Sequence, residues 1–140
     1  MEIHYIYLKL GPRVPGERVT YFKYEISVNQ EPMYIYPAFL NTDDIAGNIV
    51  TLWETGYSPM PSEVTQIVIK ITGNIASGCS IKVMGKVWGF GASKEQKIEP
   101  QYDKITSYTI KLPTYPDWFL PAIGASGLVI LGLIYKSRGK

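Results

Sequence analysis

The sequence predicts an all-β fold, an antiparallel β-sandwich of jelly-roll or immunoglobulin-like type, followed by a single C-terminal transmembrane helix. Two observations predict it: apolar and polar residues alternate through most of residues 1–117, and residues 118–135 lack any charged side chain. Alternation with a period of two places successive side chains on opposite faces of a strand. We therefore expect a sandwich domain over residues 1–112, with candidate strands at 2–10, 18–28, 32–39, 48–54, 64–72, 79–89 and 104–112.

The alternation is clearest in four of these candidate strands. In each, one face is apolar and the opposite face is polar or charged. The apolar faces contain Phe22, Tyr24, Ile26 and Val28; Ile67, Ile69 and Ile71; Cys79, Ile81, Val83 and Val87; and Tyr108, Ile110 and Leu112. Because an apolar face has to be covered, these strands require a second sheet packed against the first.

Glycine residues mark the ends of several strands. A loop at residues 73–78 contains Gly-Asn and Ser-Gly pairs, so we expect 64–72 and 79–89 to form a hairpin. Gly89 and Gly91 predict either a β-bulge or the end of a strand.

The charge distribution changes abruptly near the C-terminus. Residues 1–117 contain eleven Lys and Arg and twelve Asp and Glu, whereas residues 118–135 contain none of these. A helix over these residues would be about 27 Å long, close to the hydrocarbon thickness of a bilayer. We expect a Pro-rich linker at 113–117, a transmembrane helix at 118–135 and a basic tail at 136–140. The linker is predicted to be a stiff, extended connector that sets the height of the domain above the bilayer. The alternative is a buried hydrophobic helix of a soluble domain.

The side chains of this C-terminal region fall into three groups. The expected membrane anchor consists of large apolar and aromatic residues: Trp118, Phe119, Leu120, Ile123, Leu128, Val129, Ile130, Leu131, Leu133, Ile134 and Tyr135. Small residues that permit close approach of a second helix are Ala122, Gly124, Ser126 and Gly127. The residues expected to contact lipid headgroups or a packaged genome are Lys136, Arg138 and Lys140.

The composition excludes several kinds of chemistry. With one Cys and one His, the chain has no internal disulfide, no Cys-based metal cluster and no multi-His metal site. The net charge of +2 is too small to indicate a dedicated nucleic-acid binder. We interpret His4 beside Glu2, the Asp43-Asp44 pair and Cys79 as structural residues. No catalytic constellation is recognisable, so we expect a non-enzyme without cofactor, metal or small-molecule substrate.

Aromatic residues supply two candidate contact surfaces. Six tyrosines are spread over the domain, and exposed ones would suit a protein or glycan contact, although ordinary β-propensity also explains them. They are Tyr5, Tyr7, Tyr21, Tyr34, Tyr36 and Tyr57. Trp88 and Phe90 are a candidate sugar-stacking platform.

The basic tail raises a conflict over membrane topology. The positive-inside rule places the tail in the cytoplasm and the domain outside. The N-terminus has the alternation of a strand and not the pattern of a secretory leader, so an anchor at the C-terminus is expected to insert late and leave the domain in the cytosol. An internal membrane of a virion assembled in the cytosol removes the conflict, because the domain then faces a protein shell and the tail faces the genome.

This organisation of sandwich, linker, span and basic tail resembles that of membrane-anchored minor capsid proteins of icosahedral viruses with an internal membrane, including the archaeal turreted type. The resemblance implies a single-pass virion protein that acts as a structural tether between the shell and the membrane. The implied partners are the lipid bilayer and other capsid proteins, with a minor contact between the tail and nucleic acid. Two alternatives stay open: an accessory β-domain subunit of a membrane protein complex, and a membrane-anchored glycan-binding domain with Trp53 or Trp88 exposed.

Overall fold

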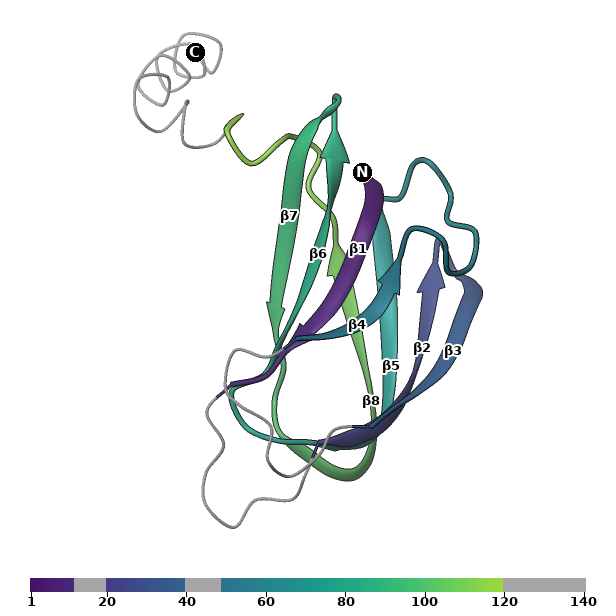
Figure 1. The fold of residues 1–140 in the computed structure, drawn as a ribbon, viewed down its shortest axis with the longest axis vertical. Helices are drawn as coiled ribbons and strands as arrows, with labels where there is room; N and C mark the ends of the chain where they lie inside the picture. Colours follow the sequence, from purple (N-terminus) through teal and green to yellow (C-terminus); the bar gives the residue numbers. More distant parts are fainter. Residues whose placement is uncertain (12–19, 40–48, 120–140) are drawn as a thin grey trace, which may run out of the picture.

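Period-two alternation produces antiparallel strands throughout the part of the chain that the computed structural model describes, residues 1–11, 20–39 and 49–119 (Figure 1). In chain order the strands are β1 (Glu2–Lys9), β2 (Tyr21–Val28), β3 (Glu31–Phe39), β4 (Ile49–Glu54), β5 (Gln66–Ile75), β6 (Ser80–Val87), β7 (Phe90–Lys97) and β8 (Gln101–Lys111). Every element assigned within these residues is a strand, which confirms the all-β prediction.

The strands form two four-stranded antiparallel sheets. One has the order β4-β1-β6-β7 and the other the order β3-β2-β5-β8. Only β2–β3 and β6–β7 are neighbours both in sequence and in a sheet among the strands described. The remaining connections therefore pass from one sheet to the other, and they tie the two sheets together at both ends.

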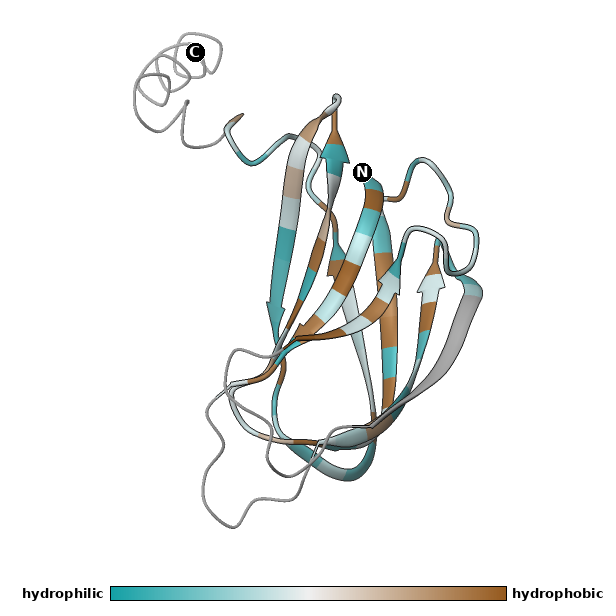
Figure 2. Cartoon of the chain, in the orientation of Figure 1, coloured by the Kyte–Doolittle hydropathy of each residue, from teal (hydrophilic) through white to brown (hydrophobic). Residues whose placement is uncertain are grey.

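The apolar faces predicted from the alternation meet between the sheets. Figure 2 shows apolar and polar residues alternating along β1 and β5. In β5, Ile67, Ile69 and Ile71 are fully buried. The apolar face predicted for β2 is also buried, with Phe22, Tyr24, Ile26 and Val28 each no more than 2% exposed. Both sheets thus contribute to one hydrophobic core, as the need to cover each apolar face requires.

One buried hydrogen bond links the sheets through this core. The Tyr24 hydroxyl of β2 donates to the backbone carbonyl of Leu52 in β4, at 2.6 Å. Tyr24 is 2% exposed and Leu52 is fully buried, so water cannot replace the bond. The bond fixes how the two sheets lie over one another at this point.

The hairpin expected between segments 64–72 and 79–89 is wrong. β5 and β6 belong to different sheets, so residues 76–79 cross from one sheet to the other. Ala76 and Cys79, at the two ends of this crossing, are 4% and 3% exposed. Turn-forming residues predict that the chain reverses direction, but they do not specify which sheet receives the next strand.

The segment 79–89 also ends differently from the prediction, because β6 stops at Val87 and a further strand, β7, follows. Trp88 (φ 56°) and Gly89 (φ 80°) both have positive φ and form a two-residue turn, with Val87 paired to Phe90 across it. Turns of this geometry match the twist of a hairpin. Gly89 therefore marks a strand end, one of the two predicted alternatives, whereas Gly91 lies inside β7.

Most of the expected membrane region lies outside the described residues. Trp118 and Phe119 are described, but the other expected anchor residues, the small residues at 122–127 and the basic tail at 136–140 are not. The Asp43-Asp44 pair is also outside. Among the described residues, no helix has the length and apolar character needed to cross a bilayer.

We expect Gly85→Ala to destabilise the sandwich by about 1–3 kcal/mol, because a core that is overpacked must shift. A Cβ at Gly85 would lie 1.9 Å from the backbone oxygen of Glu2, at the irregular pairing of β1 with β6. Urea unfolding followed by tryptophan fluorescence measures the change. Gly91→Ala is the matched control, because a Cβ there meets nothing within 4 Å. Equal stability of the two variants would contradict the close approach of β1 and β6.

We expect Tyr24→Phe to lower the free energy of unfolding by about 1–2 kcal/mol, because it leaves the buried Leu52 carbonyl without this donor. Tyr108→Phe is the control, since its hydroxyl accepts a longer, exposed hydrogen bond of 3.3 Å from the Glu99 amide. The control should cost about 0.5 kcal/mol or less in the same unfolding experiment. An equal loss of unfolding free energy in both variants would show that the Tyr24–Leu52 bond stabilises the protein no more than an exposed hydrogen bond does.

Candidate functional site

The segment that leads toward the expected span is hydrogen-bonded to the sandwich. The Leu112 amide donates to the Thr65 carbonyl at 2.9 Å, which extends the pairing of β8 with β5. Further along, the Asp117 amide donates to the Gly91 carbonyl in β7, also at 2.9 Å. The Asp117 carboxylate accepts two bonds from Ser93, one from its amide at 2.7 Å and one from its hydroxyl at 2.9 Å.

The bonds of Asp117 place the end of this segment against the outer edge of β7. β7 is the last strand of its sheet, so its outward backbone groups would otherwise face solvent. Pro113 and Pro116 have no amide hydrogen, and therefore this segment cannot pair along β7 as a regular strand. It contacts the edge through Asp117 instead, and Pro116 is buried.

The docking adds a constraint to the predicted linker. Residues 113–117 are expected to form a stiff, extended connector that sets the height of the domain above a bilayer. In the structure, the Asp117 bonds hold the end of this segment on the sandwich itself. The physical reason is that an exposed strand edge offers backbone partners that the proline pattern alone does not reveal.

Docking brings together five aromatic side chains that we call the aromatic end cluster: Tyr115, Trp118 and Phe119 from the C-terminal segment, with Trp88 and Phe90 from the β6–β7 hairpin. The Trp88 and Phe119 rings are 5.5 Å apart and perpendicular, and Phe90 and Trp118 are 5.5 Å apart at 83°. Tyr115 and Phe119 are separated by 5.6 Å. Edge-to-face contacts at such distances are favourable beyond simple burial.

The aromatic end cluster is largely exposed to solvent. Trp88 is 61% exposed, Phe90 53% and Trp118 49%. Large apolar side chains that gather on a surface in this way indicate a contact site. The sequence indicates both halves separately, Trp88 and Phe90 as a stacking platform and Trp118 and Phe119 as part of the expected anchor. It does not connect them, because nothing local relates a hairpin tip to a segment about thirty residues later.

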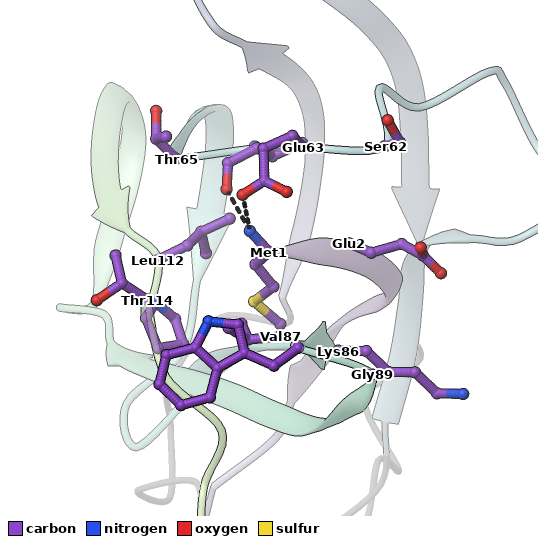
Figure 3. A pocket seen from close by; sticks show the side chains of 13 residues that line it. Met1, Glu2, Ser62, Glu63, Thr65, Lys86, Val87, Gly89, Leu112 and Thr114 are labelled. Carbon is purple, nitrogen blue, oxygen red and sulfur yellow. Dashed lines mark hydrogen bonds and ion pairs between the residues drawn. The ribbon is translucent and has the colours of Figure 1, made fainter. Parts of the chain in front are cut away.

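A hollow of about 260 Å³ lies beside the cluster, between the N-terminus and the β6–β7 turn. Figure 3 shows the amine of Met1 bound beneath Glu63 in this hollow, with Lys86 directed away from it. The amine donates to Glu63 Oε1 and to the Val64 carbonyl, both at 3.0 Å. The charge of the Met1 amine is therefore compensated by Glu63, and these two bonds hold the start of β1 in place.

Other residues singled out in the sequence do not assemble into a chemical site. His4 Nε2 lies 2.5 Å from Glu2 Oε1, as an isolated exposed pair. Within the described residues, no group of three or more His, Cys, Asp and Glu side chains is placed to hold a metal ion. Cys79 is buried, as its place in the apolar alternation predicts.

The side chains of Tyr34 and Tyr36 lie outside those that the structure describes, and the other four tyrosines do not form a single face. Tyr5 and Tyr7 lie half-buried in β1, with rings 5.1 Å apart, and the Tyr5 hydroxyl is 2.8 Å from Thr51 Oγ1. Tyr21 and Tyr57 are exposed on other parts of the domain. Trp53, the other indole of the glycan hypothesis, is 3% exposed, and its Nε1 donates to the Ser58 carbonyl at 3.1 Å. Of these two indoles only Trp88 offers an accessible ring.

Comparison with family models, curated proteins and solved structures found no match to this chain. The aromatic end cluster and the uncharged sequence that follows it are therefore the features of this chain that bear on its function.

We expect Asp117→Ala to release the docked segment from β7, because it removes the acceptor for both Ser93 donors. Hydrogen exchange of the Ser93 amide should become about tenfold faster. Glu95→Ala, which removes an exposed carboxylate from the same strand, is the control and should leave that amide protected. Unchanged exchange in the Asp117 variant would mean that the segment does not depend on this carboxylate.

Proposed function

We propose that this chain is a structural tether, a minor virion protein whose sandwich docks on a protein shell while residues 118–135 anchor it in an internal membrane. The observation that supports it best is the position of the aromatic end cluster. It lies where the sandwich passes into an uncharged stretch of bilayer length. Aromatic side chains favour the membrane–water interface, so this end of the domain is the one suited to face lipid.

The docked segment suits such a role mechanically. A flexible linker would let the sandwich move freely over the membrane. Here Asp117 accepts hydrogen bonds from both the backbone and the side chain of Ser93. Asp117 precedes Phe119 of the aromatic end cluster by two residues. The orientation of the domain is therefore coupled to the start of the proposed anchor, and a tether of fixed geometry requires this coupling.

The opposite end of the sandwich offers the surface for a shell protein. Tyr21 pairs with Asn74 and Ile105 with Thr72, near the end of β5 that is remote from Thr65 and the aromatic end cluster. Tyr21 is 56% and Ile105 64% exposed. Two ends with exposed apolar side chains fit a protein that bridges two partners. The proposed shell proteins, the bilayer and a minor nucleic-acid contact of Lys136, Arg138 and Lys140 follow from the resemblance already described.

We infer that the sandwich is closer to the immunoglobulin-like type than to the jelly roll. A jelly roll pairs its first and last strands, whereas β1 and β8 lie in opposite sheets. The immunoglobulin order pairs strand B with strand E in one sheet and strand C with strand F in the other, and here β1 pairs with β4 and β2 with β5. The tether proposal needs only the two-layer architecture and its two distinct ends.

We expect deletion of residues 120–140 to abolish stable membrane association, because it removes nearly all of the uncharged stretch and leaves the described contacts in place. The full chain should float with phosphatidylcholine vesicles in a density gradient and resist extraction by high salt, and the truncated chain should not resist it. In purified virus particles, only the full chain should be incorporated.

The control is a full-length chain with Ile105→Ser at the remote end, which should float like the unmodified protein. Salt-resistant flotation of the truncated chain would contradict an anchor in the C-terminal stretch. Normal incorporation of the truncated chain into particles would contradict the tether function.

A further inference from the structure

We infer that the aromatic end cluster is a lipid-contacting surface. The tip of the β6–β7 hairpin inserts into the headgroup region of the same membrane that the chain's own C-terminal stretch enters. This inference rests on the proposed anchor and adds a second, independent contact with the bilayer. With both contacts, the strands of the sandwich run roughly perpendicular to the membrane. The remote end, which contains Tyr21 and Ile105, then points away from the membrane.

The direction of the chain is the first argument for lipid as the occupant. Trp118 and Phe119 are the last residues that the structure describes, and the sixteen residues that follow them, 120–135, include no charged side chain. Trp88 packs against Phe119 and Phe90 against Trp118 at 5.5 Å in both pairs. If the chain enters the bilayer immediately beyond these rings, the hairpin tip lies at the same depth.

The chemistry of the rings is the second argument. An indole combines a large apolar surface with one N–H donor, and such side chains are enriched where hydrocarbon meets the headgroups. Trp88 and Trp118 are both about half exposed or more, at 61% and 49%. A hydrophilic two-residue turn would serve a hairpin as well, so a tryptophan with φ 56° at this tip is unusual for a purely structural turn.

The charges around the cluster are the third argument. Three carboxylates at this end already have partners: Glu63 contacts the Met1 amine, Glu2 contacts His4, and Asp117 accepts from Ser93. Lys86, on the strand that leads into the tip, is exposed. The Met1 ammonium compensates the charge of Glu63, which reduces the repulsion of lipid phosphates, and a lysine beside the rings can extend toward them.

The test uses the full chain reconstituted into phosphatidylcholine vesicles, with and without lipids brominated near the headgroup end of the acyl chains. Bromine quenches indoles that lie close to it. Trp118→Phe retains Trp88 together with the buried Trp53, and a double variant, Trp88→Phe with Trp118→Phe, retains Trp53 alone. We expect brominated lipid to quench the single variant at least about twofold more than the double variant, because Trp88 lies at the interface.

A repositioned indole provides the matched control. Adding Ile105→Trp to the double variant places an exposed indole on β8, opposite Thr72. Thr72 is six residues along β5 from Gln66, about 20 Å from the end that would face lipid. This indole should be quenched no more than Trp53 alone, which would support the upright orientation.

Four results would overturn the inference. If the chain enters the vesicles but Trp88 is not quenched beyond the Trp53 background, the tip does not contact lipid, and the proposed anchor stands. A Trp88 that is shielded from water yet not quenched would mark a protein partner or a second copy at the cluster. Equal quenching at positions 88 and 105 would show that the domain does not stand upright. A chain that fails to enter vesicles at all would refute the proposed anchor together with this inference.

Discussion

Each of the two sheets has one apolar face, and only the other sheet can cover it. This constraint explains why most connections cross between layers, because a chain that alternates between the sheets builds both faces of the core together. It also explains the importance of Tyr24 for stability. This residue places a hydroxyl group in the core, and the hydroxyl donates to the Leu52 carbonyl of the opposite sheet. The tip of the β6–β7 hairpin projects beyond this closed core at one end of the sandwich (Figure 1).

A second constraint comes from the edge of β7. An unpaired strand edge invites association with another chain. Here the chain's own segment covers it: Asp117 binds Gly91 and Ser93 and so brings Trp118 and Phe119 onto the hairpin. Protection of the edge and assembly of the aromatic end cluster are thus one structural event. If the anchor of a tether begins at this point, the docked segment gives the sandwich a defined orientation relative to the anchor.

The residues that form the core could be predicted from their spacing, but the partners of the strands could not. Ile67, Ile69 and Ile71 are buried as the alternation requires. β7 was not predicted, because in its sequence FGASKEQK only Ala92 is buried and the one-sided apolar pattern is missing. Four of the five rings of the candidate site are recognisable in the sequence, as two unrelated pairs, Trp88 with Phe90 and Trp118 with Phe119. Their union depends on a hydrogen bond between Asp117 and Ser93, and such a contact leaves no periodic signal.

The sequence by itself determined the class of fold, the inward face of each main strand and the uncharged stretch toward the C-terminus, because these depend on the order of residues within one segment. Only the tertiary structure decided which sheet receives each strand, where residues 112–119 lie and which aromatic rings meet. These features depend on contacts between segments that are far apart in the chain. The free energy of such contacts arises only when both surfaces are already folded, and therefore no local pattern records them.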